Sequence, residues 1–192
     1  MTICMTSANE FTAQRNVWQV ENCIARIAKN DKAALAELYQ ETRACVYGFA
    51  LSVLKNTHDA EDVLHDCYMA VWSSAQNYRP QGKPMAWVYT ITRNLCLMKL
   101  RERKKSGVDV PENWEGYLEE KESVTAEDKL FISECMKTLA DQERQIVILY
   151  AVGGFKHREI AEMLSLPLAT VLSKYNRAMK KLKAQFMKGE QG

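Results

Sequence analysis

The segment FKHREIAEMLSLPLATVLSKYNRAMKKLK, residues 155–183, restricts the possible folds of this chain more than any other stretch. Apolar residues recur at helical spacing on both sides of Ser165-Leu166-Pro167, which predicts two helices joined by a tight turn. Between Leu172 and Lys188 the chain has six basic residues and no acidic one. A helix-turn-helix with a basic second helix commonly places that helix in the DNA major groove. A basic face that is only solvated is the alternative.

The rest of the chain also favours helices. No long stretch alternates with period two, and glycine and proline are scarce, with eight and four residues. Six further helices are expected. The first covers 17–29, and the second follows the cap Asn30-Asp31 and ends at the break Lys55-Asn56-Thr57. The others run from Asp59 to about Trp72, from Pro84 to Lys105, from a cap formed by Thr125 with Asp128, and from a cap at Asp141. For the last helix and the Pro84 helix, the expected core positions are Trp87, Ile91, Leu95, Met98, Ile146, Val147, Tyr150 and Ala151.

The distribution of charge indicates two modules. Net charge is only +2, but Arg93 to Lys105 contains six basic residues against Glu102. The following stretch, 106–128, contains eight acids against Lys121. The chain is therefore predicted to be all-α, with two small helical domains joined by a flexible acidic linker, and the second domain a helix-turn-helix, winged-helix-like module. The predicted boundaries are a flexible start at 1–16, a first domain at 17–105, a linker at 106–124, a second domain at 125–187 and a tail at 188–192.

The predicted third helix is rich in acidic residues and has the sequence DAEDVLHDCYMAVW. Residues 59–72 contain four acids and no Lys or Arg, and Asp59, Asp62 and Asp66 share one stripe at spacings of three and four. Such a stripe can dock on a basic partner, where complementary charge sets orientation and association rate. An ordinary solvated face is the alternative, and a phosphate-binding role is excluded.

The predicted loop at 73–84 and the helix after it combine aromatic, amide and basic residues. Asn77, Tyr78 and Arg79 lie in the loop, and Arg93 and Asn94 lie on the helix. Aromatic rings next to amide and basic groups suit single-stranded or flipped bases. The alternative is that the aromatics, Trp87 above all, are core residues.

Several classes of function have no sequence support. There is no phosphate-binding glycine loop, nucleophile elbow or other catalytic constellation, so we expect no enzyme, no cofactor and no small-molecule substrate. His58, His65 and Cys67 match no usual metal-ligand spacing. The six cysteines form no C-x-x-C pair and fall mostly in helical apolar patterns, which fits core positions in a reduced cytoplasm. No signal peptide or membrane span is predicted.

Taken together, these segments resemble the extracytoplasmic-function (ECF) group of bacterial RNA polymerase sigma factors, in the sigma-70 family. DAEDVLHDCYMAVW resembles the helix that docks on the clamp of the polymerase β′ subunit. MAWVYTITRNLCLMKLRERKK, residues 85–105, resembles the segment that joins the −10 promoter element. Residues 140–183 resemble the module that binds the −35 element and the β flap. The resemblance covers roughly residues 17–105 and 125–183.

The resemblance implies a role for each group of residues. Polymerase contact is expected from Asp59, Glu61, Asp62 and Asp66. Contact with the opened −10 element is expected from Asn77, Tyr78, Arg79, Arg93 and Asn94. Contact with the −35 element is expected from Thr170, Ser173, Lys174, Arg177, Lys180, Lys181 and Lys183. The implied partners are core RNA polymerase (β′ clamp and β flap), promoter DNA and an anti-sigma factor.

Five positions depart from the family pattern. Met98 stands where the family usually has Asp, which predicts an apolar contact in place of a carboxylate. In the second helix of the helix-turn-helix, Ala169, Leu172 and Lys174 replace the usual Gly, Lys and Arg. Lys156 stands where a Ser or Thr cap is usual. These changes bear on −35 preference, since Lys lacks the bidentate fork of Arg.

Two other functions stay open at this level. A stand-alone helix-turn-helix regulator of duplex DNA would explain residues 155–183 without polymerase, although no dimerisation heptad is present. A polymerase-binding protein of the same fold that has lost promoter choice would fit the departures at Met98 and Leu172.

Overall fold

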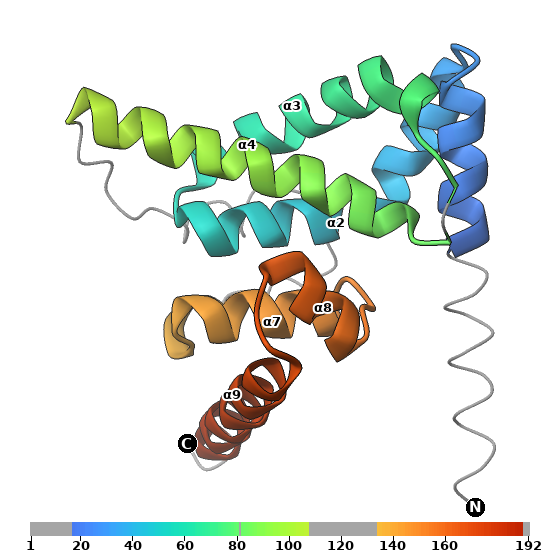
Figure 1. The fold of residues 1–192 in the computed structure, drawn as a ribbon. Helices are drawn as coiled ribbons and strands as arrows, with labels where there is room; N and C mark the ends of the chain where they lie inside the picture. The colour runs from blue at the N-terminus through green and yellow to red at the C-terminus, as the bar shows by residue number, and fades with distance from the viewer. Residues whose placement is uncertain (1–16, 81, 108–133, 190–192) are drawn as a thin grey trace, which may run out of the picture.

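The computed structural model describes residues 17–80, 82–107 and 134–189 (Figure 1). These residues form helices and contain no strand, so the all-α prediction is confirmed. The first part consists of a helix over 17–27, α2 (Lys32–Leu54), α3 (Thr57–Ser74), the 3-10 helix η1 (Ala75–Asn77) and α4 (Pro84–Ser106). The second part consists of a short helix over 134–138, α7 (Asp141–Ala151), α8 (His157–Leu164) and α9 (Leu168–Gly189).

Local signals account for the helix ends in the first part. The Asp31 side chain accepts hydrogen bonds from the backbone N–H groups of Ala33 and Ala34, as predicted for the start of α2. Pro84 opens α4, which is also as predicted. The start of α3 was predicted at the wrong residue, because the cap is Asn56, whose side chain accepts from the N–H of Asp59. The Asp59 carboxylate is therefore not used as the cap.

The apolar core of the first part lies between the 17–27 helix, α2, α3 and α4, and Met136 of the second part also packs into it. Val88, Thr92 and Cys96 form the buried stripe of α4. The predicted apolar stripe differs from this buried stripe by one position along the sequence, so the predicted core residues Ile91 and Leu95 are only half-buried. Met98 is 52% exposed, which contradicts the apolar contact predicted for it.

The described cysteines form no disulfide, and burial raises the pKa of the Cys67 thiol to about 11. Most of them are core residues, which agrees with their expected apolar positions. They are Cys23, Cys67, Cys96 and Cys135, which are buried, and Cys45, which is half-buried.

The second part is organised around α7. Its N-terminus is closed by Glu143, whose carboxylate accepts from the N–H of Ala140, whereas Asp141 was predicted as the cap and is instead the first helical residue. Ile148 and Leu149 are fully buried, while Tyr150 is 39% exposed and the predicted core residue Ala151 is also exposed. Whether a residue of α7 is buried depends on which side of the helix other helices cover, and the periodicity of the sequence alone does not show this.

The two parts share an apolar contact, here called the interdomain core. Phe49 of α2 and Tyr89 of α4 pack there with residues of α7, α8 and α9 and with Phe155. The Tyr89 ring contacts both phenylalanines edge to face, at centroid distances of 5.4 Å to Phe49 and 5.0 Å to Phe155. The Cys45 thiol donates to the carbonyl oxygen of Val152 at 2.8 Å. Figure 1 shows α7 and α8 lying against α2 and α4, with α9 pointing away from them.

Some predictions concern residues outside the described ranges. They are the flexible start at 1–16, nearly all of the linker at 106–124, the Thr125–Asp128 cap and the end of the tail at 188–192.

Candidate functional site

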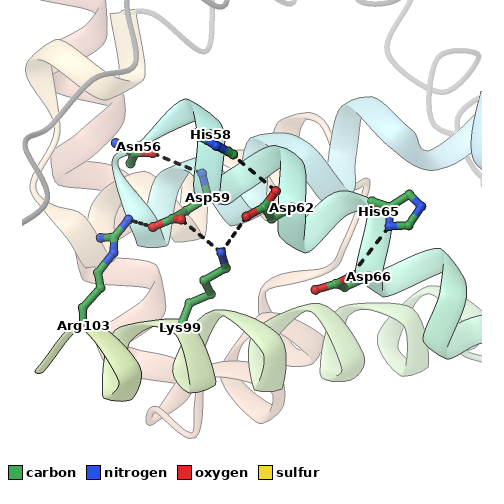
Figure 2. A network of polar contacts seen from close by, with 8 residues as sticks. All are labelled: Asn56, His58, Asp59, Asp62, His65, Asp66, Lys99 and Arg103. Carbon is green, nitrogen blue, oxygen red and sulfur yellow. Dashed lines mark hydrogen bonds and ion pairs between the residues drawn. The ribbon is translucent and has the colours of Figure 1, made fainter. Parts of the chain in front are cut away.

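The acidic stripe of α3 is divided by its neighbours. Asp59 points toward α4, where it accepts hydrogen bonds from Arg103 and, at 3.1 Å, from Lys99 (Figure 2). Lys99 also donates to Asp62 at 2.7 Å. The Asp59 side chain is only 18% exposed, so much of its charge is neutralised within the fold. The basic residues Lys99 and Arg103 are likewise engaged with α3.

The ionisation of this network follows from its geometry. Burial raises the pKa of Asp59, but hydrogen bonds from Arg103 and Lys99 outweigh burial and hold that pKa below its ordinary value. Burial lowers the pKa of Lys99, but the carboxylates of Asp62 and Asp59 outweigh it and hold the pKa above its ordinary value. Both shifts favour the charged forms of Asp59 and Lys99.

The outer part of the acidic stripe borders a hollow of about 560 Å³, here called the acidic hollow. Asp66 is 57% exposed there and lies 3.7 Å from His65. The hollow combines three carboxylates with apolar and aromatic groups, which suits a basic protein segment with an apolar side chain. Its lining residues are Tyr39, Glu61, Asp62, Leu64, His65 and Asp66.

The connection between α3 and α4 carries Asn77, Tyr78 and Arg79 and is here called the aromatic loop. It is held against the helix over 17–27. The Tyr78 hydroxyl donates to Glu21 at 3.2 Å, and the same carboxylate oxygen accepts from the Gly82 N–H at 3.1 Å. The Tyr78 ring lies 4.9 Å from the Trp87 ring, and both pack against the core of the first part. Trp87 is thus a core residue at the base of the loop. Asn77 and Arg79 are exposed beside it.

Arg93 does not lie on an open surface. It borders a cavity of about 180 Å³ together with Gln142 and Gln145 of α7 and with Leu164 and Leu166 from the end of α8. The neighbouring Asn94 is exposed. The sequence contained no signal for this placement, because it depends on how the two parts pack.

The rotation of α9 about its axis is set by three buried residues, Val171, Ala178 and Leu182. The remaining sides carry the residues predicted to contact the −35 element. Five of these seven residues are exposed, and the other two, Thr170 and Lys174, are half-buried. Two of the basic residues also face Glu143, which lies 2.7 Å from Lys181 and 4.0 Å from Arg177. Burial raises the pKa of Glu143, but Lys181 and the Ala140 N–H outweigh it and lower that pKa.

Two groups of residues in the second part were not predicted. Arg144 is buried and donates to the carbonyl groups of Cys135, Met136 and Leu139, which satisfies the end of the 134–138 helix. The His157 ring lies 4.6 Å from both Tyr150 and Tyr175. Helical spacing could have paired none of these rings, since each comes from a different helix.

No helix in the described ranges has the length and apolar content that a membrane crossing requires. Within the same ranges, no group of three or more His, Cys, Asp or Glu is placed to hold a metal ion.

Comparison with known proteins supports a single family. The family model for sigma-70 region 2 matches residues 38–106, and the model for sigma-70 region 4 matches residues 132–182. Together the two matches span more than half of the chain. The curated relatives include the ECF RNA polymerase sigma factor SigK of Mycobacterium bovis (strain BCG / Pasteur 1173P2), which is 26% identical over 167 residues. That alignment covers 83% of this chain and 89% of the relative. SigK of Mycobacterium sp. (strain KMS) is 28% identical, with 83% and 86% covered.

Solved structures share the fold. CnrH, solved in complex with the cytosolic domain of CnrY, has a TM-score of 0.57 at 22% identity, with 88% of this chain and 97% of that chain covered. The sigma factor RpoE, solved with the anti-sigma factor NepR from Bartonella quintana, has a TM-score of 0.62 at 22% identity, with 79% and 96% covered. The chain belongs to the ECF group of the sigma-70 family of RNA polymerase sigma factors.

Proposed function

We propose that this sigma factor binds core RNA polymerase through the acidic hollow and directs promoter-specific initiation by reading a −10 and a −35 element. The observation that carries the proposal is the presence, in one chain, of an acidic hollow on α3 and a helix-turn-helix with a basic second helix. The two surfaces suit partners of opposite charge. The protein acts as a regulatory subunit and not as an enzyme, and it works in the cytoplasm, where bacterial polymerase and DNA are found.

The acidic residues divide into two roles. Glu61, Asp62 and Asp66 line the acidic hollow and contact the basic β′ clamp. Asp59 was predicted to contact the clamp as well, but its carboxylate is occupied by Lys99 and Arg103. It holds α3 against α4 and thereby fixes the hollow, so its effect on polymerase binding is indirect.

The −10 element is engaged by the loop after α3 and by the exposed side of α4. Asn77 and Arg79 reach the opened strand, with Tyr78 beside them at the rim of the loop. Asn94 extends this surface along α4. Arg93 joins it only after α7 and the end of α8 leave the cavity that it borders. Promoter engagement therefore requires the two parts to separate.

The −35 element is engaged by α9. Thr170, Ser173 and Lys174 lie in its first two turns, the part of a recognition helix that usually meets base edges. The later basic residues Arg177, Lys180, Lys181 and Lys183 contact phosphates. The β flap is the polymerase partner of this module.

An anti-sigma factor is the remaining partner. CnrH and RpoE were each solved in a complex, with the cytosolic domain of CnrY and with the anti-sigma factor NepR, respectively. A fold shared with both supports a protein partner that holds this chain away from polymerase.

The alternative of a stand-alone duplex-binding regulator is not favoured, because it leaves the acidic hollow and the aromatic loop without a role. A polymerase-binding protein without promoter choice would keep the hollow but would not need the basic residues of α9.

The test is co-elution of the full chain with bacterial core polymerase. Glu61→Lys combined with Asp66→Lys should abolish co-elution, because both side chains border the hollow. Glu102→Lys is the matched control, since Glu102 is an exposed acid on α4 outside the hollow. Co-elution that survives the double reversal would refute the assigned docking surface. Failure of the wild type to bind polymerase would refute the proposed function.

A further inference from the structure

The first turns of α9 expose apolar side chains within a basic surface. Leu168 is 42% exposed and Leu172 is 40% exposed, one helical turn further along. Single exposed leucines are common on protein surfaces. The surroundings of Leu172 are unusual, because Lys174 and Arg177 lie within the next five residues and α9 contains no acidic residue. An acid-free basic helix favours a polyanion as the occupant of this face.

The packing of α9 determines where Leu172 points. Val171 is fully buried, and each helical residue turns by about 100° relative to the one before it. Leu172 is therefore rotated from the core side toward the outer face, which carries exposed Ser173 and Asn176. A partner that binds to the outer face of α9 therefore contacts Leu172 at the edge of that face.

The polar group next to Leu172 is partly used by the helix itself. The Ser173 hydroxyl donates to the carbonyl oxygen of Thr170 at 3.0 Å. In this conformation the hydroxyl can accept a hydrogen bond from a base but cannot donate one. Lys174 provides a point charge without the planar fork of Arg. Hydrogen bonding thus offers limited base discrimination at this end of α9.

Apolar contact offers a different means of discrimination. In the major groove, thymine alone among the four bases presents a methyl group, at C5. We propose that Leu172 is a specificity-determining residue that packs on the C5 methyl of a thymine in the −35 element. The inference rests on the proposed function, because it takes α9 to be the helix that enters the groove. It assigns Leu172 selectivity for thymine, whereas a basic residue at this position would contact phosphate or guanine.

The experiment uses the full chain reconstituted with core polymerase. A promoter is first selected from a duplex library randomised at the −35 and −10 positions, by run-off transcription. Each thymine of the selected −35 element is then replaced singly by uracil, which removes the methyl and keeps every hydrogen-bonding group. With the wild type, one such replacement should weaken promoter binding about fourfold, the effect of losing one buried methyl-sized group. With Leu172→Ala, the same replacement should have no effect.

Met179→Ala is the matched control. Met179 is equally exposed, at 40%, and lies on the same helix about 10 Å further from the N-terminus of α9. This variant should keep the full uracil effect. Unchanged helical circular dichroism and thermal unfolding should accompany both substitutions, because both side chains are exposed.

The outcomes separate the two proposals. Absence of promoter-directed transcription by the wild type refutes the proposed function, and the inference with it. Transcription with an equal uracil effect in wild type and Leu172→Ala, or with no thymine selected in the −35 element, refutes the inference alone. Weaker core polymerase binding by Leu172→Ala, with the uracil effect retained by the complex that still forms, assigns Leu172 to a protein interface and also refutes the inference.

Discussion

The Tyr89 ring on α4 meets the Phe155 ring edge to face, with the centroids 5.0 Å apart, although the two residues belong to different parts of the chain. Both side chains are buried, at 1% and 7% exposure. Edge-to-face pairs stabilise beyond their buried area, so this contact is a principal link between the two parts.

Phe155→Ala should therefore both destabilise the second part and loosen its attachment to the first. Truncating a buried phenylalanine costs about 3–5 kcal/mol. We expect a lower urea midpoint together with a larger radius of gyration by small-angle X-ray scattering. Leu168→Ala, a truncation of an exposed side chain, should change neither quantity. A Phe155→Ala protein with wild-type stability and dimensions would show that the interdomain core does not hold the two parts together.

Asp59→Asn should destabilise the first part, because it removes a carboxylate that accepts hydrogen bonds from Lys99 and Arg103. Hydrogen bonds to charged groups contribute about 1.5–3 kcal/mol each. The expected loss at pH 7 in urea unfolding is about 1–3 kcal/mol, since the side chain keeps some exposure. Asp66→Asn, at an exposed carboxylate, should cost far less.

The Asp59 contribution should also depend on pH in a defined direction. The folded-state pKa of Asp59 is below its ordinary value, so its stabilisation is present above the unfolded-state pKa of about 3.9. The stabilisation is lost as the pH falls through the lower, folded-state pKa. The stabilities of wild type and Asp59→Asn should therefore converge below about pH 4. A difference that stays constant from pH 7 to pH 3 would contradict this assignment.

The two glycines after α7 should respond differently to alanine. A Cβ at Gly153 would lie 2.6 Å from the Leu149 carbonyl oxygen and 2.8 Å from the Phe155 ring, so Gly153→Ala should cost about 1–3 kcal/mol through overpacking. Gly154 has open space but a φ of +70°, so Gly154→Ala should cost only about 1 kcal/mol of left-handed strain. Thermal unfolding should rank the variants in this order. Gly154→Asn should be milder still, because Asn tolerates this conformation. The reverse order would show that backbone conformation outweighs the clash.

His157 should make the second part less stable in mild acid. Burial between Tyr150 and Tyr175 lowers the pKa of His157, so the unfolded chain binds its proton more readily than the folded chain. Stability is then full above the unfolded pKa of about 6.5 and falls as the pH drops below it. Unfolding between pH 7.5 and pH 5.5 should show a smaller pH dependence for His157→Gln. Equal slopes for wild type and His157→Gln would exclude His157 as the source.

Elements governed by neighbouring residues were predictable from the sequence. The cap Asp31, the start at Pro84 and the break at Ser165 all lie where periodicity and capping chemistry place them. Errors arose where another helix decides burial. Tyr150 was expected in the core and is partly exposed, whereas Leu149 beside it is buried in the interdomain core, which also contains Phe49 of α2 and Tyr89 of α4.

Some features of the candidate site were likewise predictable from the sequence, and others depend on packing. The sign of the charge on α3 and on α9 is a property of the sequence itself, since ionisable side chains keep their charge wherever the helix packs. Which of these charged side chains remain free to contact a partner depends instead on tertiary contacts. Asp59 is paired with a residue 44 positions away, and Arg93 borders a cavity with α7.

Local sequence is enough to predict that the chain is helical, where most helices begin and end, and which helices are acidic or basic, because these depend on residues within a turn or two of one another. The packing of the helices determines that Asp59 is structural while Asp66 is exposed, that Arg93 lies between the two parts, and that Leu172 lies at the edge of the outer face of α9. Those outcomes depend on contacts between residues far apart in the sequence, whose pairing is set by packing and not by local pattern.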